Sequence, residues 1–214
     1  MKKLFYILPV IALTSACASF KPDYVIRDAS ENSRPSWTVQ KNAYKSDDSD
    51  NKKKYRYYVN DAENPDQNLC LNLAESRATQ KVASEISQEI MSKFKEKSSS
   101  KDDESNRTVK NELERNIQVN LHGVAVTGKY WEKRAYSTEL GAEKNKIGYK
   151  CDVAVRISNS ALAEALEAYK AKTMRQLSKD DQKAMNAAVD ATIDLVKTGA
   201  PLAGAVLEAA VGAN

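Results

Sequence analysis

The feature that most constrains the fold is an apolar stripe between residues 67 and 97. Apolar side chains recur there every three or four positions, with polar and charged residues between them: Leu71, Ala74, Ala78, Val82, Ile86, Ile90 and Phe94. This spacing is typical of an amphipathic α-helix. Pro65 and Asp66 provide a helix start, and a serine cluster at residues 98–100 provides its end. Because two positions of the stripe are alanine, the helix can lie close to a sheet, and we expect it to cover one.

Three segments with aromatic, β-branched or alternating apolar residues predict the strands of that sheet: 55–60, 124–136 and 146–157. In the last of them, Cys151 and the apolar side chains occupy every second position, and charged residues such as Asp152 fall between them. Side chains alternate between the two faces of a strand, so we expect one face to be buried and the other to face solvent. With a loop around Gly141, the last two segments predict an antiparallel hairpin.

Residues 104–121 allow two interpretations. Apolar side chains at every fourth position favour a second helix, whereas the last of them also alternate as in a strand that begins near Ile117. Gly123 then marks either a helix end or a β-bulge.

Two more helices are expected after the hairpin. Ser158 or Asn159 caps the first, at residues 160–177, and Ser178 caps the second, which runs to residue 197. The small apolar tail at residues 202–213 can close back on the preceding helix or pack against a second copy of the chain. The predicted fold class is therefore α+β, a long helix packed on a small antiparallel β-sheet, with a C-terminal helical extension.

Residues 1–17 have the order of a bacterial export signal. A short basic start is followed by an apolar run at residues 4–13, then by small residues, and then by Cys17. A signal that ends on cysteine resembles a lipobox, after which the cysteine is acylated and becomes the new N-terminus. The alternative is an ordinary cleaved signal with an incidental cysteine. Thr14 stands where leucine is usual, and Leu13 lies one place early.

Acylation of Cys17 makes membrane lipid the first expected partner. One acyl chain is a marginal anchor, because each buried methylene contributes only about 0.8 kcal/mol, and two or three chains hold stably. No later apolar run reaches the roughly 18 residues of a transmembrane helix. In Gram-negative sorting an Asp after the lipidated cysteine favours the inner membrane. Ala18 follows here, so we expect an outer-membrane protein that faces the periplasm or the cell surface.

The expected organisation has four parts: a signal at residues 1–16, a lipidated N-terminus and flexible tether at 17–54, an α+β domain at 55–165, and the helical extension at 166–214. The tether is polar. It has too little apolar surface to bury in compensation for the conformational entropy that it would lose on folding, so we expect it to be flexible. Trp37 interrupts it. A tryptophan in a linker usually docks onto something, so the true domain edge can lie there.

Cys70 and Cys151 remain after Cys17 is assigned to lipid. In an oxidising compartment an even remainder suggests one disulfide. It would close a loop of about 80 residues and join the start of the long helix to the last strand. The alternative is two buried free thiols.

The composition argues against several classes of function. Without Lys2 and Lys3 the 33 basic residues fall to 31 against 29 acidic ones, so the formal charge falls from +4 to +2. A net charge this close to zero does not indicate a nucleic-acid-binding surface. His122 is the one histidine, and no metal-binding or phosphate-loop motif occurs. We therefore expect no catalytic residues, no metal and no cofactor.

Aromatic residues concentrate on the predicted sheet, and strand alternation turns some of them outward. The candidate partner-binding residues are Trp37, Tyr57, Tyr130 and Trp131. Outward aromatics are typical of a protein-binding or glycan-binding surface. The alternative is that these rings pack against Trp37 or against the C-terminal helices.

A loose but ordered series of motifs runs through residues 35–165. After the lipobox come Pro35-Ser36-Trp37, the strand at 55–60, Glu75-Ser76-Arg77-Ala78, Gly123-Val124-Ala125-Val126, Tyr130-Trp131 and a final strand at 149–157. The series resembles the twenty-kilodalton bacterial lipoprotein family (Lpp-twenty). The resemblance implies a long helix on a small antiparallel sheet, in a family whose members include outer-membrane lipoproteins, some linked to flagellar or envelope structures. It supplies no catalytic residues, and the helical extension after Ala165 departs from it.

Two functions follow as hypotheses. The first is a non-enzymatic outer-membrane lipoprotein that acts as a structural or interaction module and binds itself or an envelope partner. The second is a periplasmic module that binds a small ligand or glycan in a concave aromatic pocket.

Overall fold

The computed structural model describes residues 21–39, 54–97, 103–172, 177–200 and 202. The export signal, Cys17 and the tail at residues 203–214 lie outside the described residues, and the predictions made for them stay predictions.

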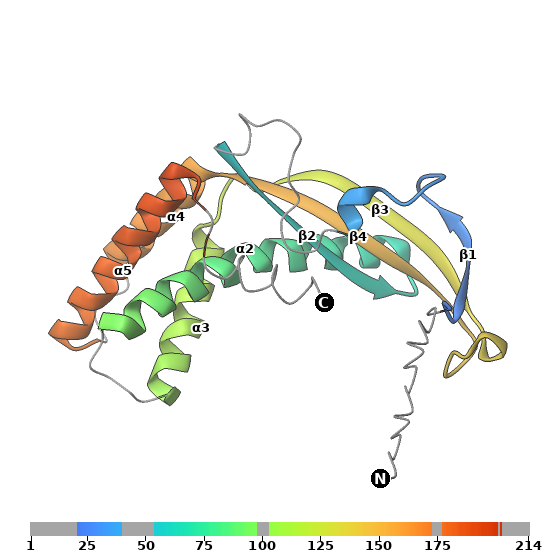
Figure 1. The fold of residues 1–214 in the computed structure, drawn as a ribbon, viewed down its shortest axis with the longest axis horizontal. Helices are drawn as coiled ribbons and strands as arrows, with labels where there is room; N and C mark the ends of the chain where they lie inside the picture. The colour runs from blue at the N-terminus through green and yellow to red at the C-terminus, as the bar shows by residue number, and fades with distance from the viewer. Residues whose placement is uncertain (1–20, 40–53, 98–102, 173–176, 201, 203–214) are drawn as a thin grey trace, which may run out of the picture.

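A four-stranded antiparallel sheet forms one layer of the protein (Figure 1). Its strands are β1 (Tyr24–Ala29), β2 (Tyr55–Asn64), β3 (Ala125–Tyr136) and β4 (Lys146–Ser158), in the order β1-β3-β4-β2. The predicted hairpin of β3 and β4 is confirmed, with Trp131 opposite Cys151 and Tyr136 opposite Lys146. The expected strand at residues 55–60 is also confirmed, and it continues to Asn64, because Glu63 and Asn64 still pair with β4.

The long helix α2 (Gln67–Lys97) spans the predicted residues and packs on β2 and β4. Its start is fixed by Asp66, whose Oδ1 accepts a hydrogen bond from the backbone N–H of Leu69 at 2.8 Å. The members of the apolar stripe from Ala74 to Phe94 are buried. The apolar stripe predicted from the sequence is therefore the face of α2 that packs on the sheet.

The helix interpretation of residues 104–121 is the right one. Helix α3 (Asp103–Asn120) buries Leu113 and Ile117, which lie one turn apart. Val119 faces solvent, so the alternation that suggested a strand has no structural counterpart. Gly123 lies between α3 and β3 in the left-handed region with φ 76°, and the β-bulge occurs later, between Val126 and Gly128.

Two helices follow the sheet, α4 (Asn159–Lys172) and α5 (Lys179–Thr198). The hydroxyl of Ser158 accepts from the N–H of Ala161 at 3.1 Å, and that of Ser178 accepts from the N–H of Asp181 at 3.2 Å. Both therefore act as N-caps. α4 ends before the predicted residue 177, and the expected domain boundary at residue 165 falls inside it.

The C-terminal helices share one apolar core with the rest of the fold. Buried residues of α4 and α5 belong to the same cluster as those of α2 and β4: Leu162, Leu166, Tyr169, Met185, Val189, Ile193 and Val196. Within that core the Sγ atoms of Cys70 and Cys151 lie 2.00 Å apart, which is disulfide distance. The predicted cysteine pair thus joins the first turns of α2 to the middle of β4.

The expected flexible tether is wrong for part of its length. Residues 24–29 form β1, which pairs with β3, and residues 36–38 form a short 3₁₀ helix, η1 (Ser36–Thr38). The polar composition of this segment does not prevent order, because β1 is held by backbone hydrogen bonds to β3. Val25 and Ile26 stay about half exposed, so this strand requires little apolar burial of its own.

Candidate functional site

Polar side chains gather on the face of the sheet opposite α2, which we call the outer face. Cross-strand partners share a face, so the register places Tyr130 beside Asp152, and Glu132 beside Lys150. Sequence alternation predicted that this side of β4 faces solvent. That prediction is wrong for Asp152, which is buried, because Arg34 of the N-terminal segment lies over it.

Glu132 is the most fully engaged carboxylate of the outer face. Its Oε1 accepts a hydrogen bond from the hydroxyl of Tyr130 at 3.0 Å, and its Oε2 accepts from Nε and Nη2 of Arg134 at 2.8 and 2.6 Å. All three side chains are buried. Burial, followed by the hydrogen bond to Glu132, raises the pKa of Tyr130 to about 12. The tyrosine therefore stays neutral and acts as a donor at physiological pH.

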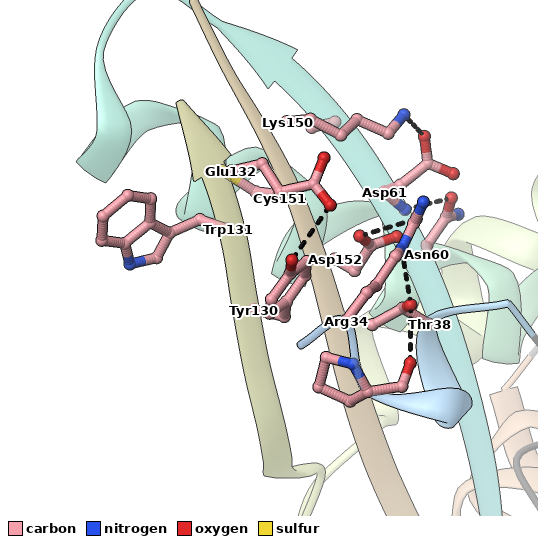
Figure 2. A network of polar contacts seen from close by, with 12 residues as sticks. Arg34, Thr38, Asn60, Asp61, Tyr130, Trp131, Glu132, Lys150, Cys151 and Asp152 are labelled. Carbon is pink, nitrogen blue, oxygen red and sulfur yellow. Dashed lines mark hydrogen bonds and ion pairs between the residues drawn. The ribbon is translucent and has the colours of Figure 1, made fainter. Parts of the chain in front are cut away.

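Arg34 connects η1 to the sheet (Figure 2). Its Nη2 lies 3.2 Å from Oδ2 of Asp152, and its Nε donates to the hydroxyl of Thr38 at 2.8 Å. That hydroxyl in turn donates to the carbonyl of Pro35 at 2.8 Å. The guanidinium thus bridges a buried carboxylate and the turn that carries Trp37.

Lys150 and Asp61 form the third ion pair of the outer face, and Glu63 lies 3.7 Å from the same ammonium group. Together with the pairs at Asp152 and Glu132, the network contains three cations and four carboxylates. Its charges therefore nearly balance, and the network does not present a strong excess of one sign.

Burial raises the pKa of Asp152 above its ordinary value of 3.8, and the charges of Arg34 and Lys150 offset this only in part. The folded state then binds this proton more tightly than the unfolded chain does. The protonated Asp152 therefore contributes its full stabilisation below pH 3.8. This contribution to the free energy of unfolding is lost as the pH rises from 3.8 through the raised pKa.

We predict that Arg34→Met raises the pKa of Asp152 further, because it keeps most of the side chain over the carboxyl and removes the larger of the offsetting positive charges. A ¹³C NMR titration of the Asp152 carboxyl measures the change. Lys93→Ala is the control, because Lys93 pairs with Glu89 on α2 and should leave Asp152 unchanged. A pKa of Asp152 that is unchanged or lower in the Arg34 variant contradicts the prediction.

Trp37 docks on β3 at Gly128. A Cβ built on Gly128 would lie 3.0 Å from Cζ2 and 3.2 Å from Cε2 of the indole. The absence of a side chain at Gly128 is therefore what lets the ring approach the strand this closely. The expectation that a tryptophan in the tether docks onto the domain is confirmed.

We predict that Gly128→Ala lowers the free energy of unfolding by about 1–2 kcal/mol, because the ring must move away from an added methyl group. Urea unfolding and the Trp emission maximum measure the effect. Gly148→Ala is the matched control on the neighbouring strand, since its Cβ would make an ordinary contact at 3.6 Å. Equal stabilities of the two variants would show that Trp37 does not rest there.

The four candidate partner-binding residues lie on two different faces of the sheet. Trp37, Tyr57 and Tyr130 belong to the outer face, where Trp37 and Tyr57 are half-buried and Tyr130 is buried. Trp131 lies on the opposite face, and its ring meets that of Tyr149 edge-on at 5.7 Å. The four therefore do not form one surface.

Other rings of the outer face carry stacked cations. Arg156 lies 4.7 Å from the ring centroid of Tyr55, and Arg134 lies 4.0 Å from that of Tyr24. Tyr24 also contacts Tyr136, with the ring centroids 5.5 Å apart. These arginines are held in place by aromatic surfaces on both ends of the sheet.

Four members of the network were not predicted from the sequence: Arg34, Thr38, Glu132 and Arg134. One signal was present for the last two, because residues two apart on a strand share a face and their charges are opposite. No spacing rule connects Arg34 with Asp152, which lie 118 residues apart.

A cavity of about 120 Å³ opens at the end of the sheet, beside Tyr136, Ile147 and Tyr149. Pockets for drug-sized ligands have volumes of roughly 300–1,000 Å³, so this one fits a group of a few heavy atoms. Within the described ranges, no cluster of three His, Cys, Asp or Glu side chains suited to a metal ion is found, and no helix is long and apolar enough to cross a membrane.

The chain matches no protein-family model, and no curated protein or solved structure is significantly similar to it.

Proposed function

We propose that this chain is an outer-membrane lipoprotein, anchored through acylated Cys17, whose α+β domain is a non-enzymatic interaction module of the cell envelope. The observation that carries the interaction part is the outer face, where half-buried aromatic rings and stacked arginines surround a core of charges that are already paired. Tyrosine, tryptophan and arginine are the residues enriched in protein interfaces.

The paired charges support a binding role for the outer face. Both oxygens of Glu132 are occupied by Tyr130 and Arg134, and Asp152 is held by Arg34. A partner can therefore cover this face without leaving these carboxylates unpaired, which lowers the desolvation cost of association. The half-buried rings of Tyr55, Tyr57 and Trp37 supply apolar area around the paired charges.

The anchor part is supported by the order of residues 1–17 and by the nearby start of the fold. β1 begins at Tyr24, so the domain follows Cys17 closely. The family resemblance stays a prediction, and the long helix on a small antiparallel sheet agrees with what it implies.

Intact mass of the protein purified from its native membrane tests the anchor. We expect a chain that lacks residues 1–16 and carries acyl mass on Cys17. The fraction found in the outer membrane should fall sharply in Cys17→Ser. A lipid-free mass, or an unchanged distribution of Cys17→Ser, contradicts the anchor.

Photo-crosslinking in living cells tests the interaction surface. A photoreactive residue in place of Tyr57 should give a discrete crosslinked species, either with an envelope protein or with a second copy. The control position is Lys183, an exposed residue of α5. The same species from both positions, or none from Tyr57, contradicts a specific interface on the outer face.

The alternative function, binding of a small ligand or glycan, is favoured by the cavity beside Tyr136 and Tyr149. Sugar-induced quenching of Trp131 fluorescence tests it, because that indole contacts Tyr149. A concentration-dependent, saturable change that Tyr149→Ala abolishes supports this alternative.

A further inference from the structure

The covalent chain places one end of the sheet near the proposed anchor. Tyr24 pairs with Tyr136, and Tyr136 pairs with Lys146, so β1 begins where the connection between β3 and β4 lies. A chain of seven residues spans at most about 25 Å when fully extended. Cys17 therefore stays within about 25 Å of this connection. We call this part of the molecule the hairpin end.

Apolar side chains at the hairpin end are uncovered. Val25, Ala135 and Ile147 pair across three strands and share the face on which α2 packs. The helix does not cover them, because it begins only after Asn64, which pairs with Tyr149. Val25 is 47% exposed and Ile147 is 61% exposed.

Two more exposed apolar residues lie near this row. Leu140 is in η2 (Thr138–Leu140), within the connection itself, and is 45% exposed. Leu69 is in the first turn of α2, near the end of β2, and is 59% exposed. Four exposed large apolar residues thus belong to elements that begin, end or turn at the hairpin end, the part of the domain nearest to the anchor in the chain.

The charges of the connection and of the first residue of β4 cancel one another. Glu139 and Glu143 are matched by Lys144 and Lys146, and the ammonium group of Lys146 lies 4.5 Å from the ring centroid of Tyr136. A surface that met anionic headgroups by electrostatics would need an excess of lysine. This end of the molecule is suited instead to an apolar contact that depends little on lipid charge.

We propose that the hairpin end rests in the interface of the bilayer that holds the acyl chains of Cys17, with Ile147, Leu140, Val25 and Leu69 in contact with lipid. The inference rests on the proposed anchor. Burial of these side chains adds an apolar membrane contact to an anchor that two or three acyl chains already make stable. The domain then stands on the membrane by its hairpin end, and α4 and α5 lie at the far end of the sheet (Figure 1).

The test uses the acylated full-length protein in phosphatidylcholine vesicles. An environment-sensitive fluorophore is attached at Ile147→Cys and, as the matched control, at Val119→Cys, which is 69% exposed on α3. Both positions are solvent-exposed, so both variants should fold. Spin-labelled phospholipid should quench the fluorophore at position 147 roughly twofold and leave position 119 unchanged, and 1 M salt should have no effect, as for an apolar contact.

Flotation of the vesicles separates the two proposals. If the chain does not float with them, the anchor fails, and this inference fails with it. If it floats while position 147 is quenched no more than position 119, the anchor stands and the proposed orientation is overturned. Loss of quenching in high salt also overturns the apolar contact, because it would assign the approach to electrostatic attraction.

Discussion

Replacing Cys70 and Cys151 together by alanine is expected to lower the free energy of unfolding by about 4 kcal/mol. The two cysteines are separated by 81 residues, and cross-linking a loop of that length removes much of the entropy of the unfolded chain, worth roughly 4.5 kcal/mol in the loop-closure model. Thermal unfolding followed by circular dichroism should show a Tm lower by ~8–16 °C, since each kcal/mol shifts the Tm of a chain of this size by about 2–4 °C.

Reduction of the wild-type protein is the matched control. Because Cys70 and Cys151 are both fully buried, the reductant is added to unfolded protein, which is then refolded. The reduced wild type should unfold near the temperature of the double alanine variant, and reductant should not shift that variant further. A wild-type Tm that does not respond to reduction would show that the two thiols are free.

The bridge also has a consequence for the hairpin end. It fixes the first turns of α2 to β4 at Cys151, four residues inward of Ile147. Without it, the start of α2 is held by the cap at Asp66 and by packing. We therefore expect the double variant to exchange backbone amides faster than the wild type at Leu69 and Leu71. The increase should be smaller in the middle of α2.

The elements that the sequence predicted well are those in which the spacing of the apolar residues marks the buried face. α2 buries one helical stripe, and β4 buries Cys151, Val153, Val155 and Ile157 on one face, so both patterns can be recognised without knowledge of their neighbours. β1 is different. It is an edge strand paired with the backbone of β3. Tyr24, Val25 and Ile26 are residue types typical of strands, but the run is short and lies in a polar segment whose overall composition indicated a tether.

The candidate site was predicted only in part for the same reason. Alternation assigned Asp152 to the polar face correctly, but its burial depends on Arg34, which reaches it from another part of the chain. Trp37 was the one local sign that residues 34–38 dock on the sheet. Sequence spacing indicates which face a residue belongs to, and it does not indicate what covers that face.

The second large effect is expected at the Glu132–Arg134 pair. Arg134→Met removes both donors from Oε2 of Glu132 and leaves a buried carboxylate with the hydrogen bond from Tyr130 alone. Breaking a buried ion pair in this way costs about 3–5 kcal/mol, because the remaining charge is uncompensated. Urea unfolding measures the loss. The variant also removes the guanidinium from the ring of Tyr24, so exchange of the β1 amides should rise with it.

Two comparisons decide whether burial is the cause. Glu75 and Lys129 form an ion pair at 3.1 Å whose side chains are 40% and 46% exposed, so Lys129→Met should cost less than about 1 kcal/mol. The double variant Glu132→Gln, Arg134→Met should recover most of the loss of the single variant, because no buried charge remains. If Arg134→Met is as mild as Lys129→Met, Glu132 is solvated in solution. The outer face would then be an open polar surface, and a partner that covers it would have to desolvate Glu132, which the proposed interface does not require.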